Sequence, residues 1–311
     1  MIDLHDIEVA RERIAGWVRR TPTTKLAQLK APPEIDAAVT LKLEALQVTG
    51  SFKARGAMNR LRGGTSAPRA LVTASGGNHG VAVARTAFVA GIPATIFVSR
   101  SVAADKIRKI EAWNGTVEVV GSEWTESNEA ALAHADRTGA TYFHPFADPL
   151  VVAGQGTLGL EILEDMRELD LLLVAIGGGG LIAGISTAVR ALRPAVRIVG
   201  IEPQGSPTIR ACLDAGRLVA LPEVTSRVAT MSCRKTDERI FEIARRNVDD
   251  IVLVSDDAMQ DAARWLWSEM AVAADLSGAA SIAALRSGAV DLAGAKHVCA
   301  LVCGAGPDGL A

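Results

Sequence analysis

The sequence predicts an α/β protein with two open, mostly parallel, twisted sheets and flanking helices. Short β-rich runs alternate with longer runs of helical periodicity, which is the pattern of βαβ units. The chain has 311 residues, of which 49% are hydrophobic, and this suggests about two domains with a large core. Two irregular stretches, at residues 63–68 and 144–149, interrupt the alternation. We therefore expect a small α/β domain at residues 65–143, inserted in a larger domain made of residues 1–64 and 144–311.

The expected elements follow this pattern in chain order. Before the small domain we expect a helix over residues 3–19, a strand over 39–43 and a helix over 53–62. Within it we expect strands over 70–73, 94–98, 117–120 and 141–143, helices beginning at 78 and 103, and a helix over 124–137. Beyond it we expect strands over 171–176, 196–201, 251–254 and 297–302, and helices over 159–168, from 181, over 238–246, from 257 and over 277–285. The stretch between 201 and 238 is expected to be rich in loops.

Composition argues against several classes of protein. A net charge of −2 gives no general attraction to nucleic acid or to an anionic membrane. The sequence has no apolar run of about 18 residues, so no membrane span is expected. The acidic, polar start is unlike a signal peptide, and four cysteines are too few for a disulfide framework. We therefore expect a cytoplasmic protein.

Lys53 lies in the stretch Thr-Gly-Ser-Phe-Lys-Ala-Arg-Gly, at the start of an expected helix. We expect Ser51 to cap this helix, which would leave its positive end close to the ammonium group. A cation in that place loses its proton more easily, and a neutral amine is the form that attacks a carbonyl to make a Schiff base. Taken alone, Lys53 is more simply a solvated surface lysine.

Four consecutive glycines, Gly177, Gly178, Gly179 and Gly180, lie between an apolar strand and a helix. Successive backbone N–H groups at a helix N-terminus form a phosphate site. No Gly-Lys-Ser/Thr follows, so this is not a P-loop. Two alternatives stay open: a glycine turn for tight packing, and a dinucleotide turn of an NAD-dependent oxidoreductase, which would use Gly178, Gly180 and Glu202.

Two further turns follow expected strands. The first is Ser75-Gly76-Gly77-Asn78-His79, whose backbone N–H groups suit a carboxylate, with Asn78 either a neutral donor or a helix cap. The second is Cys303-Gly-Ala-Gly, after the last strand. Cys299 is expected in the core, and so is Cys303 unless a ligand lies over the strand ends.

These stretches, in this order, resemble the fold-type II pyridoxal-phosphate enzymes, whose fold is that of the tryptophan synthase β chain. The resemblance is strongest to the branch of serine/threonine dehydratase (threonine ammonia-lyase) and serine racemase. It covers almost the whole chain, including Ala-Gly-Gln155-Gly-Thr. The Ser-Phe-Lys-x-Arg-Gly and Ser-Gly-Gly-Asn-His motifs are its most specific part.

The resemblance implies a role for each of these residues. Lys53 would hold the cofactor, pyridoxal 5'-phosphate (PLP), and would remove the α-proton of the substrate. Phe52 would lie beside the ring, Asn78 would bind its phenolic oxygen, and Cys303 would face its nitrogen. The phosphate would be bound by the N–H groups of Gly177, Gly178, Gly179, Gly180 and Leu181. The substrate would be bound by Ser75, Gly76, Gly77, Asn78 and Gln155.

The activity implied is β-elimination, the dehydration and deamination of L-threonine or L-serine to a 2-keto acid and ammonia. A neutral thiol at the ring nitrogen favours rapid loss of a β-substituent over a long-lived carbanion. The alternatives are another β-hydroxy amino acid such as 3-hydroxyaspartate, a β-replacement reaction, and a catalytically inactive binding protein on the same scaffold.

The sequence departs from the family pattern at several positions. Gly76 stands where the racemases carry a serine, so racemisation is not expected. Glu202 matches one cation ligand, but Thr208 stands where an acidic partner is expected, so we expect no metal site. Asp275-Leu-Ser-Gly replaces the usual Glu-Pro-Ser-Gly, and Ala-Thr230-Met falls where Ala-Asp-Gly is common. Both lie in regions expected near the substrate side chain, whose identity they leave open.

A homodimer is the expected assembly. Trp265 and Trp267 cannot share one face of a helix, so one of them is expected to meet a partner subunit. The other expected partner is the amino-acid substrate, with neither nucleic acid nor membrane.

Overall fold

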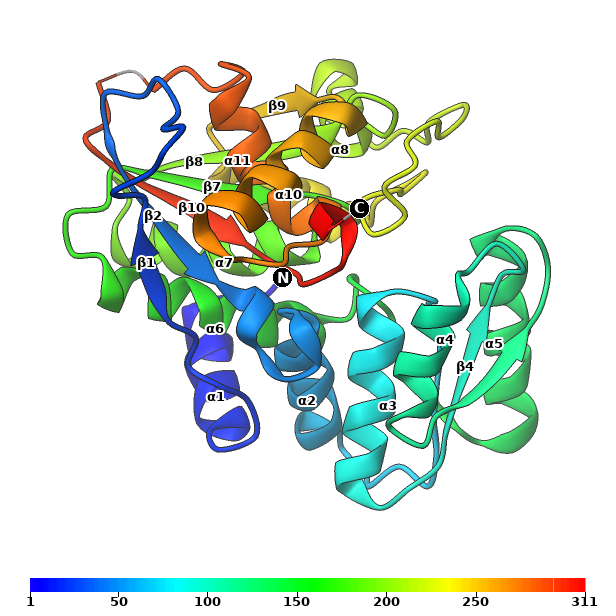
Figure 1. The fold of residues 1–311 in the computed structure, drawn as a ribbon. Coiled ribbons are helices and arrows are strands. Elements are labelled where there is room, and N and C mark those ends of the chain that lie inside the picture. The colour runs from blue at the N-terminus through cyan, green and yellow to red at the C-terminus, as the bar shows by residue number, and fades with distance from the viewer. Residues whose placement is uncertain (293, 311) are drawn as a thin grey trace.

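Two separate sheets organise the chain (Figure 1). The computed structural model describes residues 1–292 and 294–310. The larger domain expected from the sequence also includes residues 293 and 311, which lie outside the described residues. The first sheet has the strand order β1-β2-β10-β7-β8-β9, and the second has the order β5-β4-β3-β6. All neighbours pair in parallel except β1 and β2, so the expected fold class is confirmed.

The first sheet draws its strands from both ends of the chain. Its strands are β1 (Thr23–Lys25), β2 (Ala38–Leu43), β7 (Leu171–Ala175), β8 (Arg197–Pro203), β9 (Asp250–Val254) and β10 (His297–Val302). The central strands β7 and β10 are buried almost throughout, as the near-continuous apolar sequence of a two-sided parallel strand requires. β10 lies between β2 and β7, which joins the last strand of the chain to one of the first.

Helices cover both faces of this sheet (Figure 1). One layer contains α6 (Pro149–Asp165) and α7 (Gly180–Leu192), with α1 (Leu4–Ile14) and α2 (Lys53–Gly63) beyond it. The opposite layer contains α10 (Asp256–Met270) and α11 (Leu276–Arg286), and α8 spans Thr208–Ala215. The helix α9 (Glu238–Asn247) packs on α7 and α8. Short 3-10 turns are η1 (Glu44–Leu46), η2 (Val48–Gly50) and η3 (Asp308–Leu310).

The second sheet is built entirely from the middle of the chain. It contains β3 (Leu71–Ala74), β4 (Ala94–Val98), β5 (Thr116–Val119) and β6 (Thr141–Tyr142), with α3 (Asn78–Ala90), α4 (Ala104–Glu111) and α5 (Trp124–Thr138). One face carries Leu71 and Ile96 and packs against α3 and α4. The other carries Val72 and Phe97 and packs against α5. The period-2 alternation of side chains thus gives this sheet a core on each side.

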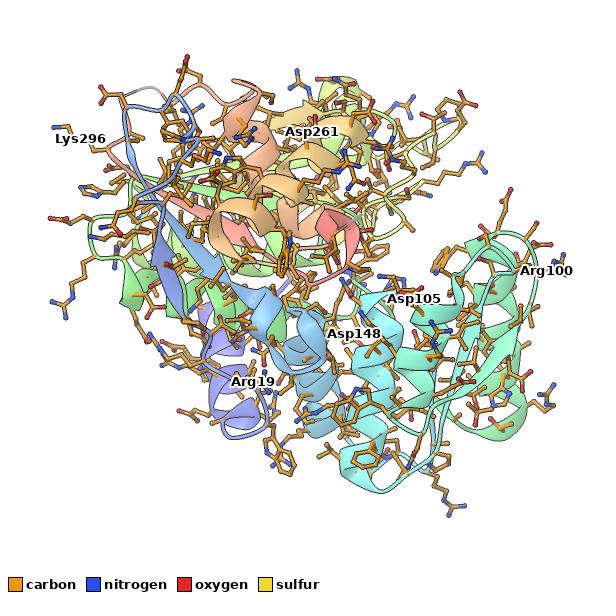
Figure 2. The ribbon with its side chains drawn as sticks, viewed as in Figure 1. Arg19, Arg100, Asp105, Asp148, Asp261 and Lys296 are labelled. Carbon is orange, nitrogen blue, oxygen red and sulfur yellow. The ribbon has the colours of Figure 1, made fainter. Side chains whose placement is uncertain are left out.

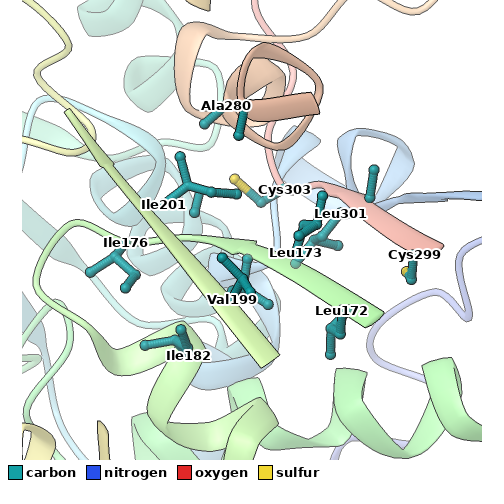
Figure 3. Close-up of a cluster of buried hydrophobic side chains, with 14 of the residues drawn as sticks. Leu172, Leu173, Ile176, Ile182, Val199, Ile201, Ala280, Cys299, Leu301 and Cys303 are labelled. Carbon is teal, nitrogen blue, oxygen red and sulfur yellow. The ribbon is translucent and has the colours of Figure 1, made fainter. Parts of the chain in front are cut away.

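Hydrophobic side chains of the first sheet form the main core (Figure 3). Cys299 and Cys303 both extend from β10 into it, so the expectation of a buried Cys299 is confirmed. Charged side chains of both signs spread over the outside, among them Arg100, Asp261 and Lys296 (Figure 2). Within the described residues, no helix is both long and apolar enough to cross a membrane.

Four element predictions were wrong. The helix expected over 159–168 begins at Pro149, because Asp148 caps it and its glycines allow close packing: a Cβ on Gly154 would lie 2.7 Å from the Cα of Gly56. The helix expected over 3–19 ends at Ile14, and Gly16 then turns the chain with φ +78°. The other two errors are the unpredicted strand β1, a three-residue antiparallel edge, and the unpredicted helix α8.

Candidate active site

The expected site residues meet at the carboxyl ends of the parallel strands, where ligands bind in open α/β sheets. Cys303 follows β10, and the glycine loop of residues 177–180 follows β7. Ser75 follows β3 of the second sheet. Loops that follow strands of both sheets therefore meet in the same region of the molecule.

Lys53 begins α2, and its Nζ donates a hydrogen bond to the carbonyl oxygen of Pro145 at 2.7 Å. Burial lowers the pKa of this amine from 10.5 to about 8, so a sizeable fraction is neutral near pH 7 to 8. The Nζ also lies 5.1 Å from the centre of the Phe52 ring. Burial therefore makes the neutral amine, the form that attacks a carbonyl, easier to reach near neutral pH.

The cause expected for this state is wrong, because Ser51 does not cap the helix. Phe52 is the N-cap residue, and no side chain makes the capping hydrogen bond. Ser51 is extended, pairs with Gly304 and leaves its Oγ buried without a partner among the described residues. Desolvation, and not a helix cap, lowers the pKa of Lys53.

The two histidines nearest to Lys53 are neutral. Burial and the nearby lysine lower the pKa of His79 to about 3 and that of His144 to about 4. His79 bonds to the carbonyl oxygen of Phe143, and His144 accepts the N–H groups of Phe146 and Ala147 through Nδ1. Neither ring therefore competes with Lys53 as the titrating group near neutral pH.

The glycine loop is a cradle of free backbone donors. Gly179 has φ +87° and is the N-cap of α7, a helix of 13 residues. Among the described residues, no group accepts a hydrogen bond from the N–H of Gly177, Gly178, Gly179 or Gly180. Phe146 packs directly on the loop: a Cβ on Gly178 would lie 2.3 Å from its ring, so only glycine fits there. The side chain of Leu181 points into the core.

Cys303 lies at the end of β10, beside Lys53 and its neighbours. Its carbonyl oxygen accepts the N–H of Phe52 at 3.2 Å. Its Sγ lies 3.4 Å from the carbonyl oxygen of Ser277. Burial and the nearby carboxylate of Asp275 raise the pKa of the thiol far above its ordinary value. Cys303 is therefore a neutral thiol at all moderate pH values.

The loop of residues 75–78 reaches this group from the second sheet. The N–H of Ser75 donates to the carbonyl of Phe97 at 3.1 Å, and that of Gly77 lies 3.3 Å from Ser75 Oγ. Within the described chain the N–H of Gly76 has no acceptor. The hydroxyl of Ser75 and the N–H of Gly76 are thus among the donors of this loop that are available to an anion. The amide of Asn78 donates from Nδ2 to Asp275 at 2.8 Å.

Thr230 lies close to both the loop of residues 75–78 and the glycine loop of residues 177–180. A Cβ on Gly77 would lie 3.5 Å from its methyl carbon, and a Cβ on Gly177 would lie 2.9 Å from its carbonyl oxygen. This exposed threonine therefore lies between the loop suited to a carboxylate and the loop suited to a phosphate. The sequence marked Thr230 only as a departure from a motif, and its contact with both loops is a tertiary feature.

Gln155 lies deeper than the other site residues. It is buried in α6, and its Oε1 accepts the N–H of Gly56, one turn after Lys53. Its Nε2 has no partner among the described residues. The structure therefore places Gln155 behind the helix that carries Lys53.

Comparison with known proteins shows the family to which the chain belongs. A sequence model of the family described as "Pyridoxal-phosphate dependent enzyme" matches residues 14–304. The chain belongs to this family. It is 37% identical to the L-threonine ammonia-lyase of Thermotoga maritima over 92% of this chain and 71% of that protein. It is 35% identical to the phenylserine dehydratase of Ralstonia pickettii over 98% of this chain and 94% of that one. The structure of maize serine racemase superposes with a TM-score of 0.92 at 30% identity, over 97% of this chain and 93% of that one.

The residues present fit PLP, the cofactor expected from the sequence and confirmed by the family. The free N–H groups of the glycine loop at a helix N-terminus suit its phosphate. Lys53 supplies an amine of lowered pKa, and Cys303 supplies a neutral group close to it. Ser51 Oγ is a further buried polar atom that lacks a partner in the described part of the chain.

The dinucleotide interpretation of Gly178, Gly180 and Glu202 is wrong for this PLP-dependent enzyme. Glu202 is fully buried, and its two oxygens accept the N–H groups of Ile209 and Arg210 at 2.8 and 2.9 Å. Both oxygens face the start of α8, and the full burial of the side chain keeps it away from a ribose. Among the described residues, no group of three or more His, Cys, Asp or Glu is placed to hold a metal ion.

Sequence reasoning missed three neighbours of the site, Pro145, Phe146 and Val102. The first two lie in the irregular stretch after β6, whose departure from the α/β pattern was the available signal. Val102 lies in an ordinary loop after β4 and gave no signal at all.

Proposed function

We propose that this PLP-dependent enzyme is an ammonia-lyase that removes water from a small β-hydroxy amino acid, L-threonine or L-serine. The products are a 2-keto acid and ammonia. The observation that carries the proposal is that Lys53 offers a proton-transfer group, whereas residue 76 of the substrate loop has no side chain to offer one. Lys53 is an amine with a pKa of about 8, whereas the substrate loop opposite presents Gly76, packed against Val102.

Each residue of the site has a part in this reaction. Ser75 Oγ and the N–H of Gly76 bind the substrate carboxylate, and Asn78 and Gln155 support the two helices that meet there. Phe52 and Asn78 would hold the cofactor ring, and the glycine loop with Leu181 would hold its phosphate. PLP, when bound, supplies the electron withdrawal that acidifies the α-proton.

Lys53 is the base in the neutral form that burial favours. It takes the α-proton and becomes an ammonium group, the bond between the β-carbon and the hydroxyl oxygen breaks, and the departing hydroxyl takes up this proton and leaves as water. Hydrolysis returns one water and releases ammonia, so the net products of L-threonine are a 2-keto acid and ammonia. Cys303 keeps its own proton throughout, because its pKa lies far above neutrality. A neutral neighbour favours fast loss of the hydroxyl over a long-lived carbanion.

The identity of the substrate side chain is open to test, because Thr230 and Asp275 stand where this chain departs from the expected family pattern. A panel of L-threonine, L-serine and 3-hydroxyaspartate, scored for keto acid and ammonia, measures it directly. We expect equal amounts of the two products from threonine or serine. A clear preference for 3-hydroxyaspartate would support that alternative. Product formation only with an added nucleophile would mean β-replacement.

We also propose that the enzyme is a cytoplasmic homodimer and that residues 65–143 are a separate domain. On α10, Trp265 is buried with its Nε1 bonded to the carbonyl of Ala31, whereas Trp267 is 45% exposed. The second copy is expected to cover Trp267, since a large exposed aromatic side chain is typical of an interface. Light scattering of wild type and Trp267→Glu tests this: the variant should shift toward monomer, and an unchanged mass would remove Trp267 from the interface.

A further inference from the structure

We propose that Asp275 is a positioning residue that fixes the amide of Asn78 and, through it, the cofactor ring. The proposal rests on the proposed function, in which Asn78 binds the phenolic oxygen of PLP. Asn78 is the first residue of α3, on the second sheet, whereas Asp275 is the N-cap of α11, on the first. The contact thus joins two parts of the molecule that are 197 residues apart in sequence.

Asp275 is buried, with 2% of its surface exposed, and its two carboxylate oxygens accept hydrogen bonds from different donors. Oδ2 accepts the hydrogen bond from Asn78 Nδ2 at 2.8 Å. Oδ1 accepts the N–H of Gly278 at 2.6 Å and the hydroxyl of Ser277 at 2.7 Å. The backbone N–H of Asp275 donates to the carbonyl of Gly304 at 3.1 Å. The side chain therefore has little freedom to turn.

No cation pairs with Asp275 among the described residues. Two helix N-termini stabilise the buried charge in its place. Asp275 caps α11, a helix of 11 residues, and its Oδ2 contacts the first residue of α3, a helix of 13. The N-terminus of each helix carries a partial positive charge, and an anion there is favoured. Three donors, from Asn78, Ser277 and Gly278, point at the two oxygens, so the carboxylate acts in this structure only as an acceptor.

An acceptor-only partner selects one end of the Asn78 amide. The side-chain amide has a donor end and an acceptor end of nearly the same shape, so its orientation is decided by hydrogen bonds. Facing a carboxylate, it must present Nδ2. One N–H of Nδ2 then binds Asp275, and the second is left for the phenolic oxygen. If the amide rotated, Oδ1 would face that oxygen and repel it.

The pair is packed closely against Gly304, where no larger residue fits. A Cβ on Gly304 would lie 2.6 Å from Asp275 Oδ2 and 2.9 Å from Asn78 Nδ2. Gly304 follows Cys303, the residue expected at the ring nitrogen. Asp275 therefore holds Asn78 next to the strand end on which the ring is expected to lie.

The test is a double-mutant cycle on cofactor binding, measured without substrate. Asp275→Asn keeps the size and the capping ability of the side chain but can present a donor to Asn78. Asp275→Ser also keeps a good cap while it removes the contact, and it serves if the first variant does not fold. Asp3→Asn, the same change at the N-cap of α1 far from the site, is the matched control. Each protein is stripped of PLP and titrated with it, and the visible spectrum is recorded.

We expect Asp275→Asn and Asp275→Ser to weaken PLP binding by roughly tenfold, the value of one hydrogen bond to a charged group. Absorption should move from the violet to the near ultraviolet, because the phenolic oxygen loses its donor. In an Asn78→Ala background the same changes should have no further effect on affinity or spectrum. Asp3→Asn should resemble wild type.

Three outcomes would overturn the proposal. Additive effects of Asn78→Ala and Asp275→Asn would mean that Asp275 acts independently of Asn78. A normal spectrum and affinity in both Asp275 variants, with Asn78→Ala impaired, would leave Asn78 in its role and remove Asp275. No effect of Asn78→Ala would remove both residues from the ring. Failure of the proposed lyase activity would be seen separately, because none of these readouts contains a substrate.

Discussion

The side chain of Val102 fills the space that any side chain at residue 76 would need. A Cβ on Gly76 would lie 2.3 Å from Cγ2 of Val102 and 2.7 Å from Cγ1. Such distances are far inside van der Waals contact, so the valine must move before residue 76 can be larger. Gly76 is the position where the resembling racemases carry a serine. By this expected correspondence the loop lacks a second proton-transfer group, and the contact with Val102 leaves no space for a serine side chain there.

Racemisation should accordingly be negligible in the wild-type enzyme. A planar carbanion returns its proton to the side that it left unless an acid stands on the other face. L-serine incubated in deuterated water should give keto acid without D-serine. D-serine formed at a rate comparable with that of the keto acid would contradict the argument from Gly76.

Gly76→Ser alone should be destabilising, by about 1–3 kcal/mol, because it overpacks the contact with Val102. Val102→Ala in the same chain should recover most of this loss, and α-proton exchange should appear first in the double variant. Urea unfolding of both single variants and the double variant measures the coupling. Strictly additive free energies of unfolding would show that the two residues do not touch.

Lys53 should destabilise the apoprotein below pH 8. Its folded pKa of about 8 lies below the ordinary 10.5, so between these values the unfolded chain binds more protons and stability rises with pH. The full shift corresponds to about 3 kcal/mol. Lys53→Met apoprotein should therefore be more stable than wild type at pH 7, and the difference should shrink as the pH rises from about 8 to 10.5. The variant should also be colourless with PLP, whereas borohydride should fix the cofactor to Lys53 in wild type. An equal difference at pH 7 and pH 10 would contradict the assigned pKa shift.

Cys303→Ser should keep most of the activity, since a hydroxyl is also a neutral partner for the ring nitrogen. Cys303→Asp should hold that nitrogen protonated and so lengthen the life of carbanionic intermediates, with more transamination or racemisation. Product ratios measured by chromatography distinguish the two variants. Identical ratios in wild type and Cys303→Asp would place Cys303 away from the ring.

Arg55 should be the most costly arginine to remove from the fold. It is 1% exposed and bonds to Glu44, itself fully buried, and to Glu161, both at 2.7 Å. Arg55→Met leaves Glu44 buried without its cation, at a cost of about 3–5 kcal/mol. Arg11→Met is the control, because the Arg11–Glu164 pair is exposed and should contribute under about 1 kcal/mol. Urea unfolding compares them, and equal losses would mean that the buried network does not stabilise α2.

The sequence by itself determined the class of fold, and it predicted the residues of the candidate site. Strand β10 was predicted at its observed bounds, because a short apolar run between turns favours a strand locally and is also what a buried central strand requires. Lys53, the glycine loop and Cys303 were found because each lies in a short motif with its own backbone chemistry. The start of α6 was missed, because glycines that disfavour an isolated helix are tolerated where they allow close packing on α2 and α7.

Only the tertiary structure decided how these residues are held. Ser51 was expected to lower the pKa of Lys53 by capping a helix, whereas burial beside the distant Pro145 does so. The contacts of Asn78 with Asp275 and of Gly76 with Val102 join segments that no local pattern relates. Side-chain identity and spacing are properties of neighbouring residues, but desolvation and steric exclusion depend on which segments the two sheets bring together. The sequence therefore predicted the residue types of the site, whereas the cause of the lowered pKa of Lys53 and the contacts of Asn78 and Gly76 became visible only in the fold.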